Sequence, residues 1–227
     1  MSIKIDNPKI REILDLDDFP LNKVIHLYGI AGSGKSTFCL QIAFLLAKQG
    51  FKSLYIDTIS LYSVNRLKQI SGSLFDKLSS LILFSNPKSF DEQNRLIDNL
   101  SNFINDDIKL IVIDDIISYY RAEIAKKPKG IRLNKMLNQQ VAQLKDLSTK
   151  NKLMVVIVNQ VRADLANPDN VTTPLSKKIF DHWSDMEVKF LTHSEEKGAR
   201  ISILKKTFDK KSLGIKCIFK ISQEGFI

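Results

Sequence analysis

Residues Gly29–Ser36 read GIAGSGKS, and this stretch indicates the architecture of the chain more directly than any other. It satisfies every fixed position of the pattern G-x-x-x-x-G-K-[S/T], whose glycines let successive backbone N–H groups point at phosphate oxygens. An apolar β-type run, residues 23–28, precedes the stretch, and a helical pattern with Phe38, Ile42 and Leu45 on one face follows it. This order of strand, glycine-rich turn and helix predicts a phosphate-binding loop and makes a chance glycine-rich turn a remote alternative.

The chemistry of such a loop assigns a role to its polar residues. Lys35 is expected to reach the β- and γ-phosphates of a nucleotide, and the hydroxyl of Ser36 is expected to ligate Mg²⁺. The helix that follows adds a favourable dipole at its N-terminus, where the phosphates would lie. ATP and Mg²⁺ are therefore the predicted cofactors. The predicted nucleotide-binding residues are Gly29, Ile30, Ala31, Gly32, Ser33, Gly34, Lys35, Ser36 and Thr37.

A second strand-like run ends in an acid. Residues 110–113 read LIVI, and Asp114 follows them, which is the Walker B pattern of a buried strand that ends in a carboxylate. Many strands end in aspartate, but the position of this run downstream of a phosphate-binding loop makes the pattern specific. Asp114 is therefore predicted to be the second protein ligand of Mg²⁺. The next residue, Asp115, is predicted to cap a helix over residues 116–125.

Apolar runs that suit buried strands alternate with helical patterns along the chain. These runs cover residues 23–28, 53–56, 81–84, 110–113 and 153–158. With a long helical pattern over about 131–149, they predict an α/β fold in which helices flank a mostly parallel sheet. A polar stretch, residues 159–181, follows, and the rest of the chain predicts three strands in a C-terminal antiparallel extension. We expect a short N-terminal extension over 1–22 and a single domain over 23–227.

Composition limits the class of protein. The 227 residues are 44% hydrophobic and 26% charged, as in an ordinary soluble globular protein. No apolar run approaches the ~20 residues of a membrane span, and the N-terminus lacks a secretory signal. The two cysteines, Cys39 and Cys217, lie in apolar segments, which predicts buried free thiols in a reducing compartment. We therefore predict a cytoplasmic protein with no membrane partner.

The positive charge of the chain is concentrated in one region. The net charge is +9, and residues 121–152 contain nine Lys or Arg against two acids, Glu123 and Asp146. A basic stripe of this kind suits a surface that binds a polyanion. It equally suits a lysine-rich solvated surface, and charge alone leaves both interpretations open.

Together with these motifs, residues 158–161 (VNQV) complete a resemblance to the RecA superfamily and, within it, to the archaeal RadB-type recombinase paralogues. Residues 55–58 (YIDT) and 63–70 resemble the family's second-strand motif and the helix after it. Residues 114–121 (DDIISYYR) are similar to the Walker B segment with its trailing aromatic–arginine pair, and 174–185 resemble the segment that leads into the C-terminal hairpin. The resemblance covers nearly the whole chain and implies a RecA-like P-loop NTPase core.

The resemblance also implies catalytic roles. Gln160 matches the glutamine that senses the γ-phosphate at the start of a DNA-binding loop. The implied catalytic residues are therefore Lys35, Asp114 and Gln160, because catalysis of phosphoryl transfer depends on positioning and on electrostatic stabilisation. Asp115 is a candidate for a substitute base, since other P-loop ATPases use an acid directly after the Walker B aspartate.

A function and partners follow from the same resemblance. The implied function is to bind ATP and DNA and to assist homologous recombination and DNA repair. Arg162, Lys177 and Lys178 lie in or beside the long polar loop, where contacts to DNA phosphates are expected, although solvated loop charge is an equal alternative. The implied partners are single-stranded DNA and a RecA-family recombinase or another paralogue, in a homo- or hetero-oligomer. Only about 22 residues precede the first strand, which predicts a core-only paralogue.

Three departures from the family pattern affect the predicted activity. Ile59 occupies the position of the catalytic glutamate, and an aliphatic side chain can neither orient nor deprotonate water, so ATP hydrolysis is predicted to be slow. Ser176–Lys178 replaces a glycine pair and makes that loop stiffer and more basic. Lys206 fits a family Lys-x-Arg pattern that reaches a neighbouring subunit's nucleotide, whereas Phe208 replaces the arginine.

Two other functions are compatible with a phosphate-binding loop. A KaiC-like regulatory ATPase would act through protein partners, with normal ATP binding and no affinity for DNA. A small-molecule kinase would need an arginine-bearing lid and an acceptor pocket, and the sequence has no such arginine cluster. Single-stranded DNA binding with a steep salt dependence separates the recombinase paralogue from the regulatory ATPase.

Overall fold

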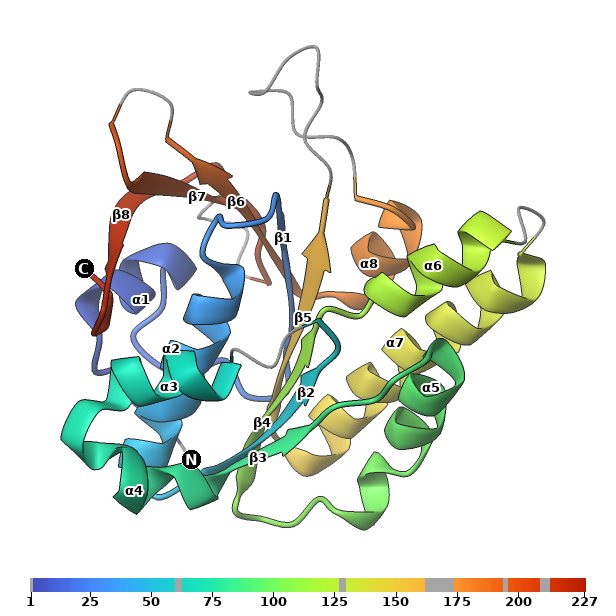
Figure 1. Cartoon of the computed structure of the whole chain (residues 1–227), viewed down its shortest axis with the longest axis horizontal. Helices are drawn as coiled ribbons and strands as arrows, with labels where there is room; N and C mark the ends of the chain where they lie inside the picture. The colour runs from blue at the N-terminus through green and yellow to red at the C-terminus, as the bar shows by residue number, and fades with distance from the viewer. Residues whose placement is uncertain (1, 60–62, 127–129, 162–173, 194–195, 209–212) are drawn as a thin grey trace.

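The computed structural model describes residues 2–59, 63–126, 130–161, 174–193, 196–208 and 213–227. Within these ranges, the strands form one nine-stranded sheet in the order β3-β2-β4-β5-β1-β6-β7-β8-β9 (Figure 1). The strands are β1 (Val24–Gly29), β2 (Lys52–Asp57), β3 (Ile82–Ser85), β4 (Ile108–Asp114), β5 (Met154–Gln160), β6 (Met186–Thr192), β7 (Ala199–Lys206), β8 (Lys216–Ser222) and β9 (Gly225–Phe226).

Helices cover both faces of the sheet. One face packs against α1 to α4, and the other packs against α5 to α8 (Figure 1). The α-helices are α1 (Pro8–Leu14), α2 (Lys35–Lys48), α3 (Ser63–Ser71), α4 (Phe75–Leu78), α5 (Phe90–Asp98), α6 (Ser118–Lys126), α7 (Ile131–Asn151) and α8 (Lys177–Trp183). Short 3-10 turns are η1 (Gly72–Leu74), η2 (Ser79–Leu81) and η3 (Leu100–Asn102). The central strands β1, β4 and β5 are buried along their whole length apart from the last residue of β5, as expected for parallel strands between two helical layers.

The predicted fold class is confirmed, with one correction in the C-terminal extension. The strand expected over the region of Met186 is β6, and it pairs in parallel with β1 and antiparallel with β7. The antiparallel part therefore begins at β7 rather than at β6. Alternation of apolar and polar residues reports that one face of a strand is exposed, but it carries no information on strand direction. The direction follows from the long connection between β5 and β6, which includes α8 and returns the chain to the other side of β1.

The first residues of the chain are part of the packed structure. Ile3, Ile5, Ile10 and Phe19 are buried in the same hydrophobic cluster as residues of β1 and α2. Helix α1 begins after Asn7, whose side-chain oxygen accepts a hydrogen bond from the N–H of Ile10. Residues 2–22 therefore cover part of the core instead of extending away from it.

Both cysteines, Cys39 and Cys217, are buried and free, as the sequence predicted. Among the helices of the described ranges, none is both long and apolar enough to cross a membrane.

Candidate nucleotide-binding site

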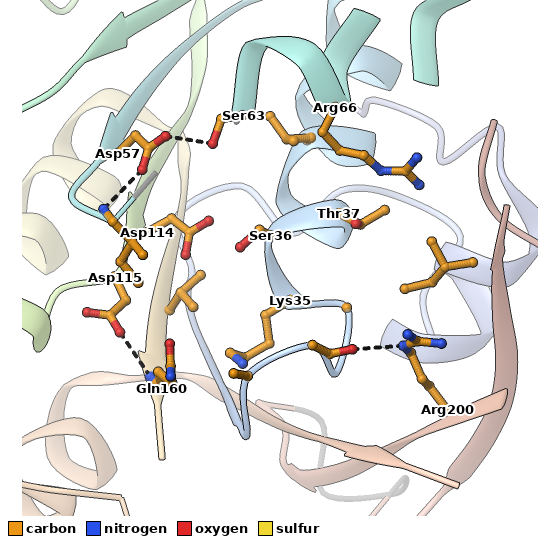
Figure 2. Close-up of a pocket in the computed structure, with 17 residues that line it drawn as sticks. Lys35, Ser36, Thr37, Asp57, Ser63, Arg66, Asp114, Asp115, Gln160 and Arg200 are labelled. Atoms are coloured by element: carbon orange, nitrogen blue, oxygen red, sulfur yellow. Dashed lines mark hydrogen bonds between the residues drawn. The ribbon is translucent and has the colours of Figure 1, made fainter. Parts of the chain in front are cut away.

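The phosphate-binding loop connects β1 to α2 and needs its glycines at two positions. Gly34, just before α2, has a φ of 103°, which L-residues with a side chain rarely adopt. Gly29 lies so close to β6 that an added Cβ would be 2.1 Å from the carbonyl oxygen of Phe190. The loop borders a cavity of about 440 Å³ at the carboxyl ends of the parallel strands, which Figure 2 shows from close by.

Most of the predicted loop residues line this cavity. Ala31, Gly32, Gly34, Lys35, Ser36 and Thr37 do so, whereas Gly29, Ile30 and Ser33 do not. The ammonium of Lys35 donates to the carbonyl oxygens of Gly29 at 2.9 Å and Ile30 at 2.7 Å, and to Ser33 Oγ at 3.3 Å. Burial lowers the pKa of Lys35 to about 8. The loop thus holds a cation that phosphate oxygens would attract from neutral oxygen acceptors.

The predicted metal ligands lie together. Burial raises the pKa of Asp114 to about 6, and hydrogen bonds from Ser36 and Tyr55 act in the opposite direction. A serine hydroxyl and one carboxylate fit Mg²⁺, which keeps several waters and takes its other ligands from nucleotide phosphates. Among the described residues, no cluster of three or more His, Cys, Asp or Glu side chains could hold a metal ion.

Asp115 is engaged by the backbone. Its Oδ1 accepts hydrogen bonds from the N–H groups of Ile117 at 3.0 Å and Ser118 at 2.6 Å, and its Oδ2 accepts one from Gln160 at 3.3 Å. These contacts confirm the predicted capping role, although α6 begins at Ser118 and not at residue 116 because the cap spans a turn first. Both oxygens of a buried carboxylate are occupied, which favours a positioning role for Asp115 over the role of a base.

Gln160 ends β5 and lines the cavity near Asp114 (Figure 2). Its N–H donates to Asp115, and its carbonyl oxygen accepts a hydrogen bond from Arg121 Nη2. The backbone of Gln160 is therefore held from both sides by the segment that follows β4. The predicted DNA contact Arg162, two residues further on, lies outside the described residues.

Ile59 also lines the cavity, and its side chain is 52% exposed. Its N–H donates to Oδ1 of Asp57 at 3.1 Å, and the Ser63 hydroxyl donates to Oδ2 of the same carboxylate at 2.6 Å. Ile59, which was predicted to stand in place of a catalytic glutamate, is thus an aliphatic side chain at the edge of the cavity, beside a carboxylate that is already hydrogen-bonded.

The cavity is also lined by three residues that sequence patterns missed. Arg66, Arg200 and Ile221 line it, from α3, β7 and β8 (Figure 2). Arg66 Nη2 donates to the carbonyl oxygen of Ser222 at 2.7 Å, and Arg200 Nε donates to that of Gly32 at 2.9 Å. Arg66 belongs to the helix after the second-strand motif, which was a usable signal. No local pattern marks Arg200 or Ile221, because they reach the site only through the antiparallel strands.

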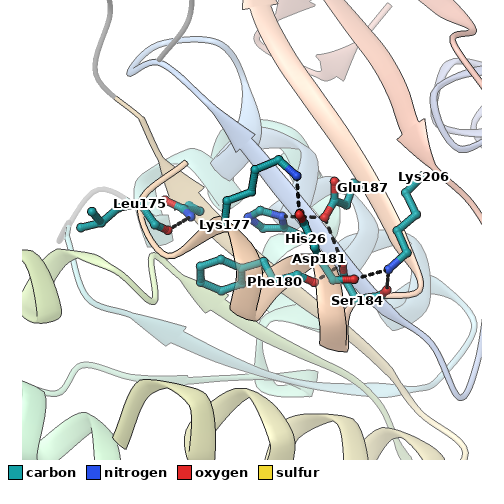
Figure 3. A network of polar contacts seen from close by, with 9 residues as sticks. His26, Leu175, Lys177, Phe180, Asp181, Ser184, Glu187 and Lys206 are labelled. Carbon is teal, nitrogen blue, oxygen red and sulfur yellow. Dashed lines mark hydrogen bonds and ion pairs between the residues drawn. The ribbon is translucent and has the colours of Figure 1, made fainter. Parts of the chain in front are cut away.

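The predicted DNA contacts at α8 differ in their surroundings. Lys178 is exposed, whereas Lys177 forms an i,i+4 ion pair with Asp181 (Figure 3). Lys206, which matched a pattern for contact with a neighbouring subunit, donates to the carbonyl oxygens of Asp181 and Ser184 at the end of α8. Within the chain, Lys206 therefore stabilises the C-terminus of this helix.

Part of the basic stripe is neutralised by nearby acids. Lys126 pairs with Glu123, Lys145 with Asp185 and Lys150 with Asp146. These contacts make a solvated surface the better interpretation for those three lysines. Arg132 and Lys135, at the exposed start of α7, form no ion pair with another described residue.

The shifted pKa values of Asp114 and Lys35 predict how nucleotide binding depends on pH. Below a pH of about 6, protonation of Asp114 competes with Mg²⁺, and above about 8, Lys35 loses the charge that attracts phosphate. Affinity for Mg²⁺–ATP is therefore expected to be highest between these values and to fall on both sides, by at most about tenfold per pH unit for each group. Titration with a fluorescent ATP analogue across this range measures the profile. Asp114→Asn should remove the acidic limb and Lys35→Ala the alkaline limb.

A phosphate-binding loop after β1, a Walker B carboxylate at the end of β4 and a glutamine at the end of β5 define a RecA-type P-loop nucleotide-binding protein. The sequence profile of the Rad51 family matches residues 16–227, and the chain belongs to this family.

Relatives of the chain cover almost its whole length. It is 32% identical to the "DNA repair and recombination protein RadB" of Methanococcoides burtonii, over 91% of this chain and 89% of that protein. The RadB protein of Methanobrevibacter smithii is 33% identical over 90% of this chain and 87% of its own length, and that of Methanocaldococcus jannaschii is 32% identical over 95% and 97%. A solved structure described as the RadB recombinase superposes with a TM-score of 0.78 at 25% identity and covers 96% of both chains.

Proposed function

We propose that this protein is an ATP-binding recombinase paralogue that binds single-stranded DNA and assists homologous recombination and DNA repair. The observation that carries the proposal is the position of Gln160. It lines the nucleotide cavity, and it lies at the start of the long connection that leads to α8. A residue in this position can transmit the presence of a γ-phosphate to that connection. The names of the relatives support recombination and repair over a regulatory ATPase that acts without DNA.

In this proposal, different residues of the cavity bind the phosphates and the metal. Lys35 and the N–H groups of the loop would hold the β- and γ-phosphates, and Ser36 with Asp114 would hold Mg²⁺. When bound, Mg²⁺ would neutralise negative charge on the phosphate oxygens. Because Ile59 cannot act as a base and Asp115 is engaged by backbone N–H groups, we propose that turnover is slow and that ATP acts mainly as a ligand that orders the DNA-binding region.

The DNA surface that we propose comprises Arg162, Lys177 and Lys178. Replacing all three with alanine is expected to weaken binding of single-stranded DNA and to make the logarithmic salt dependence of affinity shallower by about two units, because each phosphate contact contributes ~0.7. Titration of a labelled oligonucleotide at several salt concentrations measures this slope. The ion pair of Lys177 with Asp181 predicts that Lys178 contributes more than Lys177.

A matched control changes the net charge equally elsewhere. Lys48, Lys68 and Lys77 are exposed lysines of α2, α3 and α4, on the other face of the sheet. Replacing these three with alanine is expected to leave the salt slope nearly unchanged. Equal slopes for the two triple variants would move the DNA surface away from α8, with Arg132 and Lys135 as the next candidates. Normal ATP binding without DNA affinity at low salt would support the regulatory ATPase instead.

ATP hydrolysis with and without single-stranded DNA tests the whole proposal. Slow turnover and nucleotide-dependent DNA binding are the expected results. We also propose a RecA-family recombinase or another paralogue as protein partner, in a homo- or hetero-oligomer, and a cytoplasmic location.

A further inference from the structure

Tyr55 contacts the Walker B carboxylate from a neighbouring strand. The residue lies on β2, next to β4, and its side chain is fully buried. Its hydroxyl donates a hydrogen bond of 2.7 Å to Oδ2 of Asp114. Asp114 is itself 4% exposed, so water has little access to its carboxylate. The phenol is therefore a main polar partner of the oxygen that it contacts.

This contact restricts the orientation of the carboxylate. A carboxylate can rotate about its terminal torsion, which has a broad minimum, unless a partner holds one oxygen. Tyr55 holds Oδ2 and leaves Oδ1 as the oxygen that it does not engage, while the P-loop residue Ser36 hydrogen-bonds to the same carboxylate from α2. The two hydroxyl groups approach from different elements, β2 and α2, and together they restrict the rotation of the carboxylate.

The phenol ring is itself fixed in place. It packs against Phe84 of β3, with ring centroids 5.2 Å apart, and it lies in the hydrophobic cluster between the sheet and α2. A hydroxyl on a ring that cannot move is a better positioning group than one on a flexible side chain, because no rotamer freedom is lost when the metal binds.

We propose that Tyr55 is a positioning residue for Mg²⁺: it orients the Asp114 carboxylate toward the metal that accompanies the nucleotide. This inference rests on the proposed nucleotide site. Partners that orient metal ligands typically change metal affinity or activity by about 10- to 100-fold when they are removed. Tyr55 itself touches neither metal nor nucleotide in this proposal, and its effect passes through Asp114.

The test compares nucleotide affinity with and without Mg²⁺. A fluorescent ADP analogue is titrated into the full chain in excess EDTA and again in excess Mg²⁺, and the ratio of the two dissociation constants measures what the metal contributes. Tyr55→Phe keeps the ring and removes only the hydroxyl. The expected result is an EDTA affinity within about twofold of the parent and a Mg²⁺-dependent gain that is smaller by about tenfold or more.

Two further variants make the result specific. Tyr120→Phe removes another buried hydroxyl, which contacts Asn134 in the opposite helical layer, and it should keep the full Mg²⁺-dependent gain. Asp114→Asn removes the metal ligand and should lose the whole Mg²⁺-dependent gain in nucleotide affinity, whereas Tyr55→Phe should lose part of it. A purely structural role would lower the thermal stability of Tyr55→Phe and leave its Mg²⁺-dependent gain intact, and that result overturns the inference alone. A parent protein without any gain from Mg²⁺ overturns the proposed metal site and the inference with it.

Discussion

Replacing Lys35 with alanine is expected to weaken ATP binding by roughly 10- to 150-fold, because a hydrogen bond to a charged group contributes ~1.5–3 kcal/mol. The ammonium is buried and held within the loop by the carbonyl oxygens of Gly29 and Ile30, which are neutral acceptors that phosphate oxygens would replace. No other lysine lines the cavity among the described residues, and the two arginines that line it, Arg66 and Arg200, donate to the carbonyl oxygens of Ser222 and Gly32. Titration with a fluorescent ATP analogue measures the loss.

The matched control for this substitution is Lys48→Ala. Lys48 lies on the same helix, α2, but is exposed at its last turn. The Lys48→Ala variant should bind ATP with the affinity of the parent. Thermal unfolding without nucleotide checks that the Lys35 variant is folded, since the substitution removes one hydrogen-bond donor from each of two loop carbonyl oxygens. If the folded Lys35→Ala protein bound and hydrolysed ATP like the parent, the assignment of this cavity as the nucleotide site would be wrong.

Replacing Ile59 with glutamate is expected to raise ATP turnover, by up to the ~10²–10⁴-fold that a positioned general base contributes. The side chain lines the cavity and is 52% exposed, so a carboxylate can be introduced there without burial of a charge. The other proposed catalytic groups, Lys35, Asp114 and Gln160, remain in place. Steady-state hydrolysis measurements with and without single-stranded DNA give the change in turnover.

Two variants separate base catalysis from other effects. Ile59→Gln introduces a side chain of similar size that cannot accept a proton, and it should leave turnover close to the parental rate. Asp115→Asn replaces one of the two carboxylate oxygens that accept backbone hydrogen bonds with an NH₂ group that cannot accept one, so it should lower stability by ~1–3 kcal/mol and change turnover per folded molecule little. Parental turnover as fast as that of ordinary recombinases would contradict this account. A large loss of turnover in Asp115→Asn with nucleotide binding retained would identify Asp115 as the working base.

Local sequence was sufficient for the phosphate-binding loop and for the class of fold. The glycines, Lys35 and Ser36 act within a few residues of one another, and the strand before them and the helix after them have distinct periodicities. The same holds for Asp114, because a buried parallel strand is a continuous apolar run whose end is visible in the sequence. Contacts within one short segment depend on local conformation, which residue type and order specify.

Tertiary structure decided the properties that depend on segments far apart in the chain. Asp115 is adjacent to the Walker B residue in sequence, yet only the position of β5 brings the N–H of Gln160 to its carboxylate. Tyr55 and Arg200 become part of the site through strand register and through the antiparallel strands, and β6 is parallel to β1 because of the crossover that precedes it. Strand order, register and direction are set by which apolar faces pack together across the whole chain, and no local pattern encodes them.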